Sequence, residues 1–306
     1  MKKYLIFSPK FDENNGGVIC LHYLAHLINE CGAEAYLTPI FQGFEINNLN
    51  FKRPFFKVLY SKLIDKFRKF KINDAFNANV IRDISRIKDS SEWIVVYPEI
   101  TFGNPLGAKN VVRWLLHNPG FHSGTFYYGT GELHVKYHHG FSDFYYPGSK
   151  LSANILNISY FPLHLYNMDG VSPSRVGTAY CMRKGRNRKI QHDLNGSILI
   201  DGMSHAEVAS ILKRVKTFIS YDLYTAYSVF ASLCGCDSVI IPEDEISKEA
   251  WYPNPESRYG LAYGFEDLSN ASETRHLLIE KVNRDHAKNK QRVADFIIES
   301  NEFFMK

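Results

Sequence analysis

The chain has 306 residues, of which 45% are hydrophobic and 14% aromatic, so it can bury the cores of two domains of ordinary size or of one large domain. The formal net charge is only +4, which excludes a protein whose whole surface attracts nucleic acid. No internal repeat or low-complexity tract is present. We therefore expect a folded globular protein without a nucleic-acid partner.

The cysteines and the first residues of the sequence indicate the cellular compartment of the protein. The five cysteines are odd in number and include neither a CxxC pair nor the spacing of a zinc site: Cys20, Cys31, Cys181, Cys234 and Cys236. The opening MKKYLIFSP has too few apolar residues for a signal peptide, and no apolar run approaches the length of a membrane span. These features predict reduced thiols and a cytoplasmic protein.

The first elements are a strand at residues 4–7, a glycine turn and a helix whose apolar positions recur between residues 18 and 28. Gly32 supplies the end of that helix. Asn15, Gly16 and Gly17 precede its first apolar residue, and the two glycines allow a ligand to approach the backbone closely. The segment lacks the GxGxxG pattern, so a dinucleotide fingerprint is not expected.

After a strand at residues 35–40, residues 51–72 combine eight lysines and arginines with phenylalanine and aliphatic residues. A basic amphipathic helix fits an interfacial helix on anionic lipid, and residues 52–71 are our candidate for a peripheral contact with the inner face of the membrane. The alternative is a surface helix whose basic face is solvated while its apolar face packs on its own domain.

Two buried strands follow, at residues 92–100 and 110–116. His117 stands at the carboxyl end of the second, the edge where sites form in α/β sheets, and could act as a general base. A structural histidine in a turn is the alternative, and Glu132 is a rival base. His134, His138 and His139 lack carboxylate partners at ligand spacing, so no metal site is predicted.

Residues 167–177 are rich in Asn, Asp, Gly, Ser and Pro, and we place the domain boundary there. A strand at residues 178–182 leads to the basic turn RKGRNRK, which includes Arg183 and Lys184. A strand at residues 197–200 precedes a short helix with a capping box formed by Ser204 and Glu207. The last residues predict one long amphipathic helix or two.

Residues 218–242 predict a strand, a polar turn, a helix capped by Thr225 or Asp222 and ended by Gly235, and a second strand. The turn places hydroxyls and a carboxylate beside the N-terminal amides of the helix, an arrangement that suits a diphosphate and sugar hydroxyls. The side chains concerned are those of Tyr221, Asp222, Tyr224, Thr225 and Ser228.

The order strand, S-Y-D-x-x-T-x-x-S, helix, L-C-G-C, V-I-I-P resembles the donor-binding segment of GT-B glycosyltransferases. The resemblance implies that Asp222 contacts the donor sugar, that Arg183 and Lys184 lie against the donor diphosphate, and that the glycine turn at Gly16 and Gly17 faces the donor phosphates. Phe230 stands where many members carry a ribose-binding carboxylate, which is a departure from the family pattern.

The resemblance implies an α/β fold of two Rossmann-like domains facing across a cleft. We expect an acceptor-side domain at residues 1–170, a donor domain at residues 171–285, and a C-terminal helix at residues 286–306 that packs back on the first domain. No DxD triplet is present to hold a divalent cation, so metal-independent transfer without a cofactor is expected. A nucleotide-sugar epimerase or dehydrogenase would need the missing glycine fingerprint.

The expected activity is transfer of a sugar from a nucleotide-sugar to a hydroxyl of a glycan or lipid-linked glycan, in surface polysaccharide synthesis. The alternative is a non-catalytic subunit of a polysaccharide assembly machine that binds a nucleotide-sugar or a glycan, which Phe230 favours. The base is expected to be His117 or an acidic residue of the first loop, Asp12 or Glu13. The donor-binding residues are expected to be Asn15, Gly16, Gly17, Arg183, Lys184, Tyr221, Asp222, Thr225 and Ser228.

Overall fold

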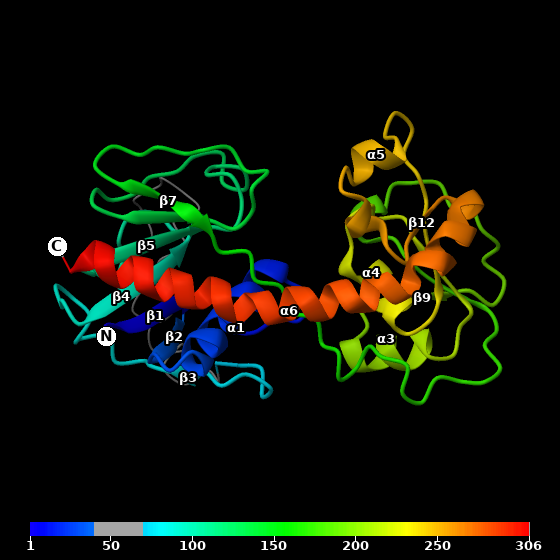
Figure 1. Cartoon of the computed structure of the whole chain (residues 1–306), viewed down its shortest axis with the longest axis horizontal. Coiled ribbons are helices and arrows are strands. Elements are labelled where there is room, and N and C mark those ends of the chain that lie inside the picture. The colour runs from blue at the N-terminus through cyan, green and yellow to red at the C-terminus, as the bar shows by residue number, and fades with distance from the viewer. Residues whose placement is uncertain (40–69, 306) are drawn as a thin grey trace, which may run out of the picture. The chain divides into compact units, whose positions relative to one another are not determined.

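A computed structural model describes residues 1–39 and 70–305. The chain forms two compact units, one of Met1–Tyr160 with His286–Lys306 and one of Phe161–Asp285. Each unit is built on a parallel sheet with helices (Figure 1). The α/β class predicted from the sequence is therefore confirmed.

Within residues 1–39 and 70–305, the first sheet has seven strands in the order β3-β2-β1-β4-β5-β6-β7, and all of these neighbouring pairs are parallel. The chain moves outward from β1 to β2 and β3, then returns beside β1 with β4 and continues the other way. The order thus reverses between β1 and β4, which is where a doubly wound sheet opens a crevice at its carboxyl edge. The strands are β1 (Lys3–Ser8), β2 (Ala35–Pro39), β3 (Asn79–Val80), β4 (Trp93–Pro98), β5 (Asn110–Leu115), β6 (Leu133–Lys136) and β7 (Lys150–Ile155).

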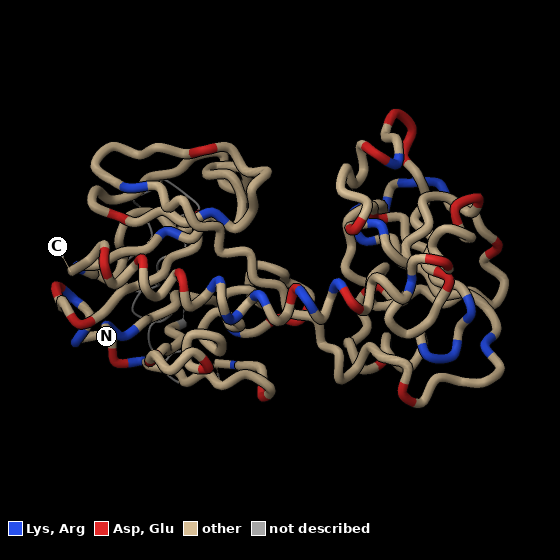
Figure 2. Tube along the Cα trace, viewed as in Figure 1, with Lys and Arg blue, Asp and Glu red and all other residues tan. Residues whose placement is uncertain are grey.

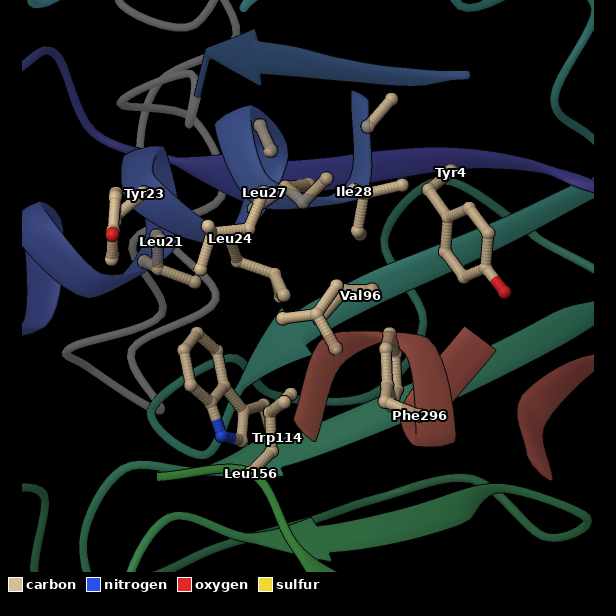
Figure 3. Packing of buried hydrophobic residues seen from close by; sticks show 14 of the residues in the cluster. Tyr4, Leu21, Tyr23, Leu24, Leu27, Ile28, Val96, Trp114, Leu156 and Phe296 are labelled. Atoms are coloured by element: carbon tan, nitrogen blue, oxygen red, sulfur yellow. The ribbon is translucent and has the colours of Figure 1, made fainter. Parts of the chain in front are cut away.

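Helix α1 (Gly16–Glu30) covers β1 and β2 of this sheet. Its Leu24 and Ile28 are fully buried and belong to the same core cluster as Val96 of β4 and Trp114 of β5 (Figure 3). Gly32, with φ of 81°, ends the helix in the left-handed conformation that favours glycine. The predicted strand, glycine turn and helix at the start of the chain are confirmed.

Helix α6 (Leu268–Phe304) is a single helix, and its residues from His286 onward belong to the first unit. Phe296 packs on Tyr4 with ring centroids 5.8 Å apart (Figure 3). The Tyr4 hydroxyl lies 2.7 Å from the Ser300 hydroxyl and accepts a hydrogen bond from Asn301 at 2.9 Å. The last turns of the chain are therefore part of the core beneath β1.

The second sheet has five parallel strands in the order β12-β11-β10-β8-β9. The chain moves from β8 to β9 on one side and then returns to β10 on the other, so the order reverses between β8 and β10. The strands are β8 (Thr178–Cys181), β9 (Ile198–Leu199), β10 (Thr217–Ser220), β11 (Asp237–Ile240) and β12 (Ala262–Tyr263). The helices are α3 (His205–Leu212), α4 (Ala226–Leu233) and α5 (Lys248–Trp251), with 3-10 turns η2 (Arg183–Gly185), η3 (Pro255–Arg258) and η4 (Phe265–Asp267).

The helix ends of the second unit follow the sequence signals. Ser204 and Glu207 form the capping box of α3, since each side chain accepts a backbone N–H of the other residue. Thr225 is the N-cap of α4, and Gly235, with φ of 81°, follows its end. The predicted capping box, the Thr225 cap and the glycine end are confirmed.

The chain passes from the first unit to the second at Tyr160 and Phe161, earlier than the boundary predicted at residue 170. The cause is an apolar segment ahead of the turn-forming residues: Phe161, Leu163 and Tyr166 pack into the core that holds α3 and α4. The polar stretch 167–177 lies inside the second unit, where Arg175 donates to the carbonyl of Val215 at 2.9 Å.

Most of the basic segment 52–71 lies outside the described residues, which resume at Phe70. Phe70 stacks on His22 of α1 with centroids 5.8 Å apart. Lysine and arginine are interspersed with aspartate and glutamate along both units (Figure 2), in agreement with the small net charge. In residues 1–39 and 70–305, no helix has the length and apolar character needed to cross a bilayer.

Candidate functional site

The loop after β1 and the end of β5 come together at the carboxyl edge of the first sheet. Asn15 caps α1 by accepting the N–H of Val18, and Asn15 and Gly16 are exposed. A Cβ added to Gly17 would lie 3.7 Å from Leu116, the residue that follows β5. The edge therefore brings the predicted glycine turn beside Leu116 and the adjacent His117.

Asp12 and Glu13 lie in the same loop. Asp12 is exposed, and its carboxylate accepts the N–H of Asn14 at 2.9 Å, which shapes the turn before α1. Glu13 is partly exposed. Both residues thus lie in the loop after β1, where the Asp12 carboxylate already holds the local backbone.

His117 stacks on Phe121 with ring centroids only 3.8 Å apart and on Phe141 at 5.3 Å. Its Nδ1 accepts the N–H of Asn118 at 2.8 Å. A neutral imidazole that accepts at Nδ1 carries its proton on Nε2, so Nε2 can donate a hydrogen bond but cannot take a proton. The geometry of His117 therefore suits a hydrogen-bond donor better than the general base predicted from the sequence.

Glu99 directly follows β4 and was not singled out by the sequence, which only places it near the end of a buried strand. Its Oε2 accepts the N–H of Leu116 at 3.1 Å. This N–H and the backbone N–H of His117 stabilise the ionised carboxylate of Glu99. The residue is 7% exposed. Burial raises the pKa of Glu99 to about 7, in spite of these N–H groups and the nearby Arg113. A carboxyl group that titrates near neutrality at a sheet edge has the property required of a general base.

Glu132, the rival base, is committed to a buried ion pair. Arg113 is 0% exposed and donates through Nε and Nη2 to the two carboxylate oxygens of Glu132, at 3.0 and 2.8 Å. Burial alone would raise the pKa of Glu132, but hydrogen bonds from His134 and Arg113 outweigh it and lower that pKa. Glu132 therefore holds Arg113, and it is not placed to take a proton from a substrate.

Arg113 in turn fixes the loop that follows Glu99. Its Nη1 donates to the carbonyl of Thr101 at 2.7 Å, and its Nη2 to that of Gly103 at 2.8 Å. The guanidinium lies over the rings of both Tyr97 and Tyr128, at 5.1 and 4.5 Å from their centroids. The buried Arg113 thus holds the backbone of the loop after Glu99 in place.

The histidines of residues 134–139 do not form a ligand set. His134 is buried, with its Nε2 3.3 Å from Glu132, whereas His138 and His139 are exposed. Within the described ranges 1–39 and 70–305, no three or more His, Cys, Asp or Glu side chains gather as they would around a metal ion.

At the carboxyl edge of the second sheet, Arg183 and Lys184 follow β8. The backbone N–H of Arg183 donates to the Asp201 carboxylate at 2.7 Å, and its guanidinium lies 5.1 Å from the ring centroid of Tyr227 in α4. Lys184 is exposed. A Cβ on Gly185 would overlap the carbonyl oxygen of Tyr221, so only glycine allows this loop to lie on the end of β10. Arg183 is therefore beside the start of α4, and the exposed Lys184 follows it in the η2 turn.

The turn before α4 is tightly hydrogen-bonded. Asp222 Oδ1 accepts the N–H of Tyr224 at 3.1 Å, and Thr225 Oγ1 accepts that of Tyr227 at 3.3 Å. The Ser228 hydroxyl is buried and has no hydrogen-bond partner among the described residues. Asp222 and Thr225 thus shape the helix start that lies next to Arg183, at the point where the strand order reverses.

Tyr221 is a correction to the predicted donor-binding set. Its ring is 0% exposed, and its hydroxyl accepts the N–H of Gln191 at 2.7 Å and lies 2.8 Å from Nδ1 of His192. The side chain points into the core because it continues the alternation of β10, which sends every second residue to one face of the sheet. Only the backbone of Tyr221 is at the edge.

Phe230 and Arg188 are structural in this unit. Phe230 stacks on Tyr166 with centroids 4.2 Å apart, so it is an aromatic residue of the core. Arg188 donates to the carbonyls of Tyr221 and Ile241 at 2.9 and 3.0 Å. It ties together the ends of β10 and β11, a role that its place in a basic turn does not indicate.

Seven chains of solved structures are similar to this chain. The chain is similar to the crystal structure of Acinetobacter baumannii MurG, with a TM-score of 0.32 and 10% sequence identity over 97% of this chain and 99% of that chain. No family model matches the chain. No curated protein sequence matches it either.

Proposed function

We propose that this protein is a glycosyltransferase that moves a sugar from a nucleotide-sugar donor to a hydroxyl of a glycan or lipid-linked glycan, without a metal, in surface polysaccharide synthesis. The observation that carries the proposal is the position of Arg183, 5.1 Å from Tyr227 in the first turn of α4. A cation and a helix N-terminus then meet where the order of the second sheet reverses, which is a general location for phosphate groups in α/β sheets.

In the proposed reaction, the bond between the anomeric carbon and the diphosphate oxygen breaks while a new bond forms to the acceptor oxygen. Negative charge accumulates on the departing nucleoside diphosphate. Arg183, Lys184 and the N-terminus of α4 would neutralise this charge, since guanidinium and ammonium groups bind phosphate oxygens strongly. Asp222 would bind hydroxyls of the donor sugar, as the resemblance to GT-B enzymes implies.

The acceptor hydroxyl must lose its proton, and we assign this step to Glu99. Its carboxyl group lies at the carboxyl edge of the first sheet, and burial raises its pKa to about 7. His117 would donate a hydrogen bond from Nε2 to a substrate oxygen. Asp12 and Glu13 are the alternative bases, and Asn15, Gly16 and Gly17 remain proposed donor-binding residues.

A thermal-shift series with UDP, GDP, dTDP and CMP sugars tests the proposal, because a ligand that binds the folded state raises its apparent stability. We expect one diphosphate donor to stabilise the protein, and Arg183→Ala with Lys184→Ala to remove that stabilisation. Lys189→Ala, in the same basic turn, is the matched control and should keep it. An unchanged response of the double variant would remove both cations from the site.

A non-catalytic sugar-binding subunit is the second candidate, and the core position of Phe230 favours it. Slow hydrolysis of the donor separates the two. If the wild-type protein releases a nucleoside diphosphate and Glu99→Gln or Arg183→Ala does not, the protein is an enzyme. Binding of the donor without any release over long incubation supports the subunit.

A further inference from the structure

The carboxylate of Asp201 holds the backbone that precedes the two cations of the second sheet. Asp201 follows β9, and its Oδ2 accepts the N–H of Arg183 at 2.7 Å. The N–H of Met182 lies 3.3 Å from both carboxylate oxygens. One side chain thus serves two consecutive N–H groups at the end of β8, across the gap between two neighbouring strands.

Arg183 has φ of 42°, in the left-handed region that side chains other than glycine rarely adopt. Such a conformation persists when surrounding groups hold it. The hydrogen bond from its own N–H to Asp201 is the contact that fixes the residue from the β9 side. Gly185 fixes the same turn from the other side by lying on the carbonyl of Tyr221.

The direction of the Arg183 side chain depends on this backbone conformation. With φ of 42° the guanidinium lies 5.1 Å from the ring centroid of Tyr227, beside the first turn of α4. A return of Arg183 to negative φ would redirect its Cα–Cβ bond and the η2 turn that carries Lys184. The left-handed conformation of Arg183 therefore brings its guanidinium to the N-terminus of α4.

An aspartate next to a diphosphate site would by itself repel the ligand. We propose that Asp201 is a positioning residue, which holds Arg183 in the left-handed conformation and so directs its guanidinium to the N-terminus of α4. This inference rests on the proposed role of that edge in donor binding. The opposite role is that the carboxylate occupies N–H groups that would otherwise bind phosphate, in which case its removal would strengthen binding.

The first test is a double-mutant cycle on the affinity for the nucleoside diphosphate selected by the thermal-shift series. Asp201→Ala should weaken binding about tenfold or more, which is the loss expected when a charge-assisted contact is misplaced. In an Arg183→Ala background it should cost little further, because the side chain it positions is absent. Asp201→Asn, which retains one acceptor oxygen, should recover part of the affinity. Asp193→Ala, the loss of an exposed aspartate that accepts the N–H of Asn195 in the same unit, is the control.

Equal or stronger binding by Asp201→Ala, or full additivity with Arg183→Ala, would overturn the inference. A solved structure of the Asp201→Asn or Asp201→Ala variant gives a test that needs no ligand. We expect Arg183 to leave positive φ and its guanidinium to leave Tyr227 in the alanine variant. If Arg183 keeps its positive φ and its contact with Tyr227 in the alanine variant, Asp201 does not position it. Failure of the wild-type protein to bind any nucleoside diphosphate would count against the proposed function alone.

Discussion

Glu99 Oε2 accepts the backbone N–H of Leu116 at 3.1 Å, and this contact joins the ends of β4 and β5 at the carboxyl edge of the first sheet. The same carboxyl group is buried, and burial raises its pKa to about 7. A group that links two strand ends and also titrates near neutrality allows separate predictions for catalysis and for stability.

The first prediction concerns activity. If Glu99 is the base, the rate of sugar transfer should rise with pH and level off above a pKa of about 7, because only the carboxylate takes a proton. Glu99→Gln should lower kcat by about 10² to 10⁴ fold. His117→Ala should leave the same ascending limb in a weaker enzyme. If Glu99→Gln keeps a near-normal kcat and His117→Ala loses the rise of the rate with pH, His117 is the base instead.

The second prediction concerns stability against pH. The pKa of Glu99 is higher in the folded state than its ordinary value, so the folded protein binds more protons between about pH 4.5 and 7. The contribution of Glu99 to the free energy of unfolding should therefore fall as pH rises through this window, by on the order of 3 kcal/mol at most. Urea denaturation of wild type and Glu99→Gln should show their difference growing in favour of the variant towards pH 7. A difference independent of pH would be incompatible with the raised pKa, and Glu92→Gln, at an exposed position before β4, is the control.

The third prediction concerns the buried pair of Arg113 and Glu132. Glu132→Ala leaves an uncompensated guanidinium in the core and should lower the free energy of unfolding by about 3 to 5 kcal/mol. The exposed pair of Lys3 and Glu34, 2.9 Å apart, provides the contrast, and Glu34→Ala should change stability little. Chemical denaturation measures both, and equal small effects would show that the buried pair does not support the edge.

The fourth prediction concerns Gly185. A methyl group at this position would overlap the carbonyl oxygen of Tyr221, so Gly185→Ala must displace the η2 turn from the end of β10. We expect the variant to fold with a stability loss of about 1 to 3 kcal/mol and to lose its response to nucleoside diphosphates. Gly16, where an added Cβ meets nothing within 4 Å, is the stability control. Normal nucleotide binding by Gly185→Ala would mean that the turn does not place the cations.

Most elements that the sequence predicts have buried, uninterrupted apolar runs or clear capping residues, whereas the strand predicted at residues 197–200 is the short, exposed β9. Strands β1, β4 and β5 consist entirely or almost entirely of buried residues, and Ser204, Thr225 and Gly235 mark helix ends by local chemistry. Strand β7, at the sheet edge, is largely exposed and has no buried apolar run. Strands β3 and β12 have two residues each, which is too short for a detectable periodicity.

The candidate site was predictable only in part. The positions of Arg183 and Thr225 follow from their place after a strand and before a helix. Glu99 was missed because its raised pKa arises from burial and from the N–H of Leu116, which is distant in sequence. Tyr221 was misassigned because strand alternation continues one residue past β10 and turns its ring into the core.

The most direct test of the account is a solved structure of the protein with the nucleoside diphosphate that stabilises it. We predict that the diphosphate lies against the guanidinium of Arg183, Lys184 and the N-terminus of α4. A diphosphate bound elsewhere on the molecule, with Arg183 still over Tyr227 and no phosphate within hydrogen-bonding distance of it, would contradict the central claim.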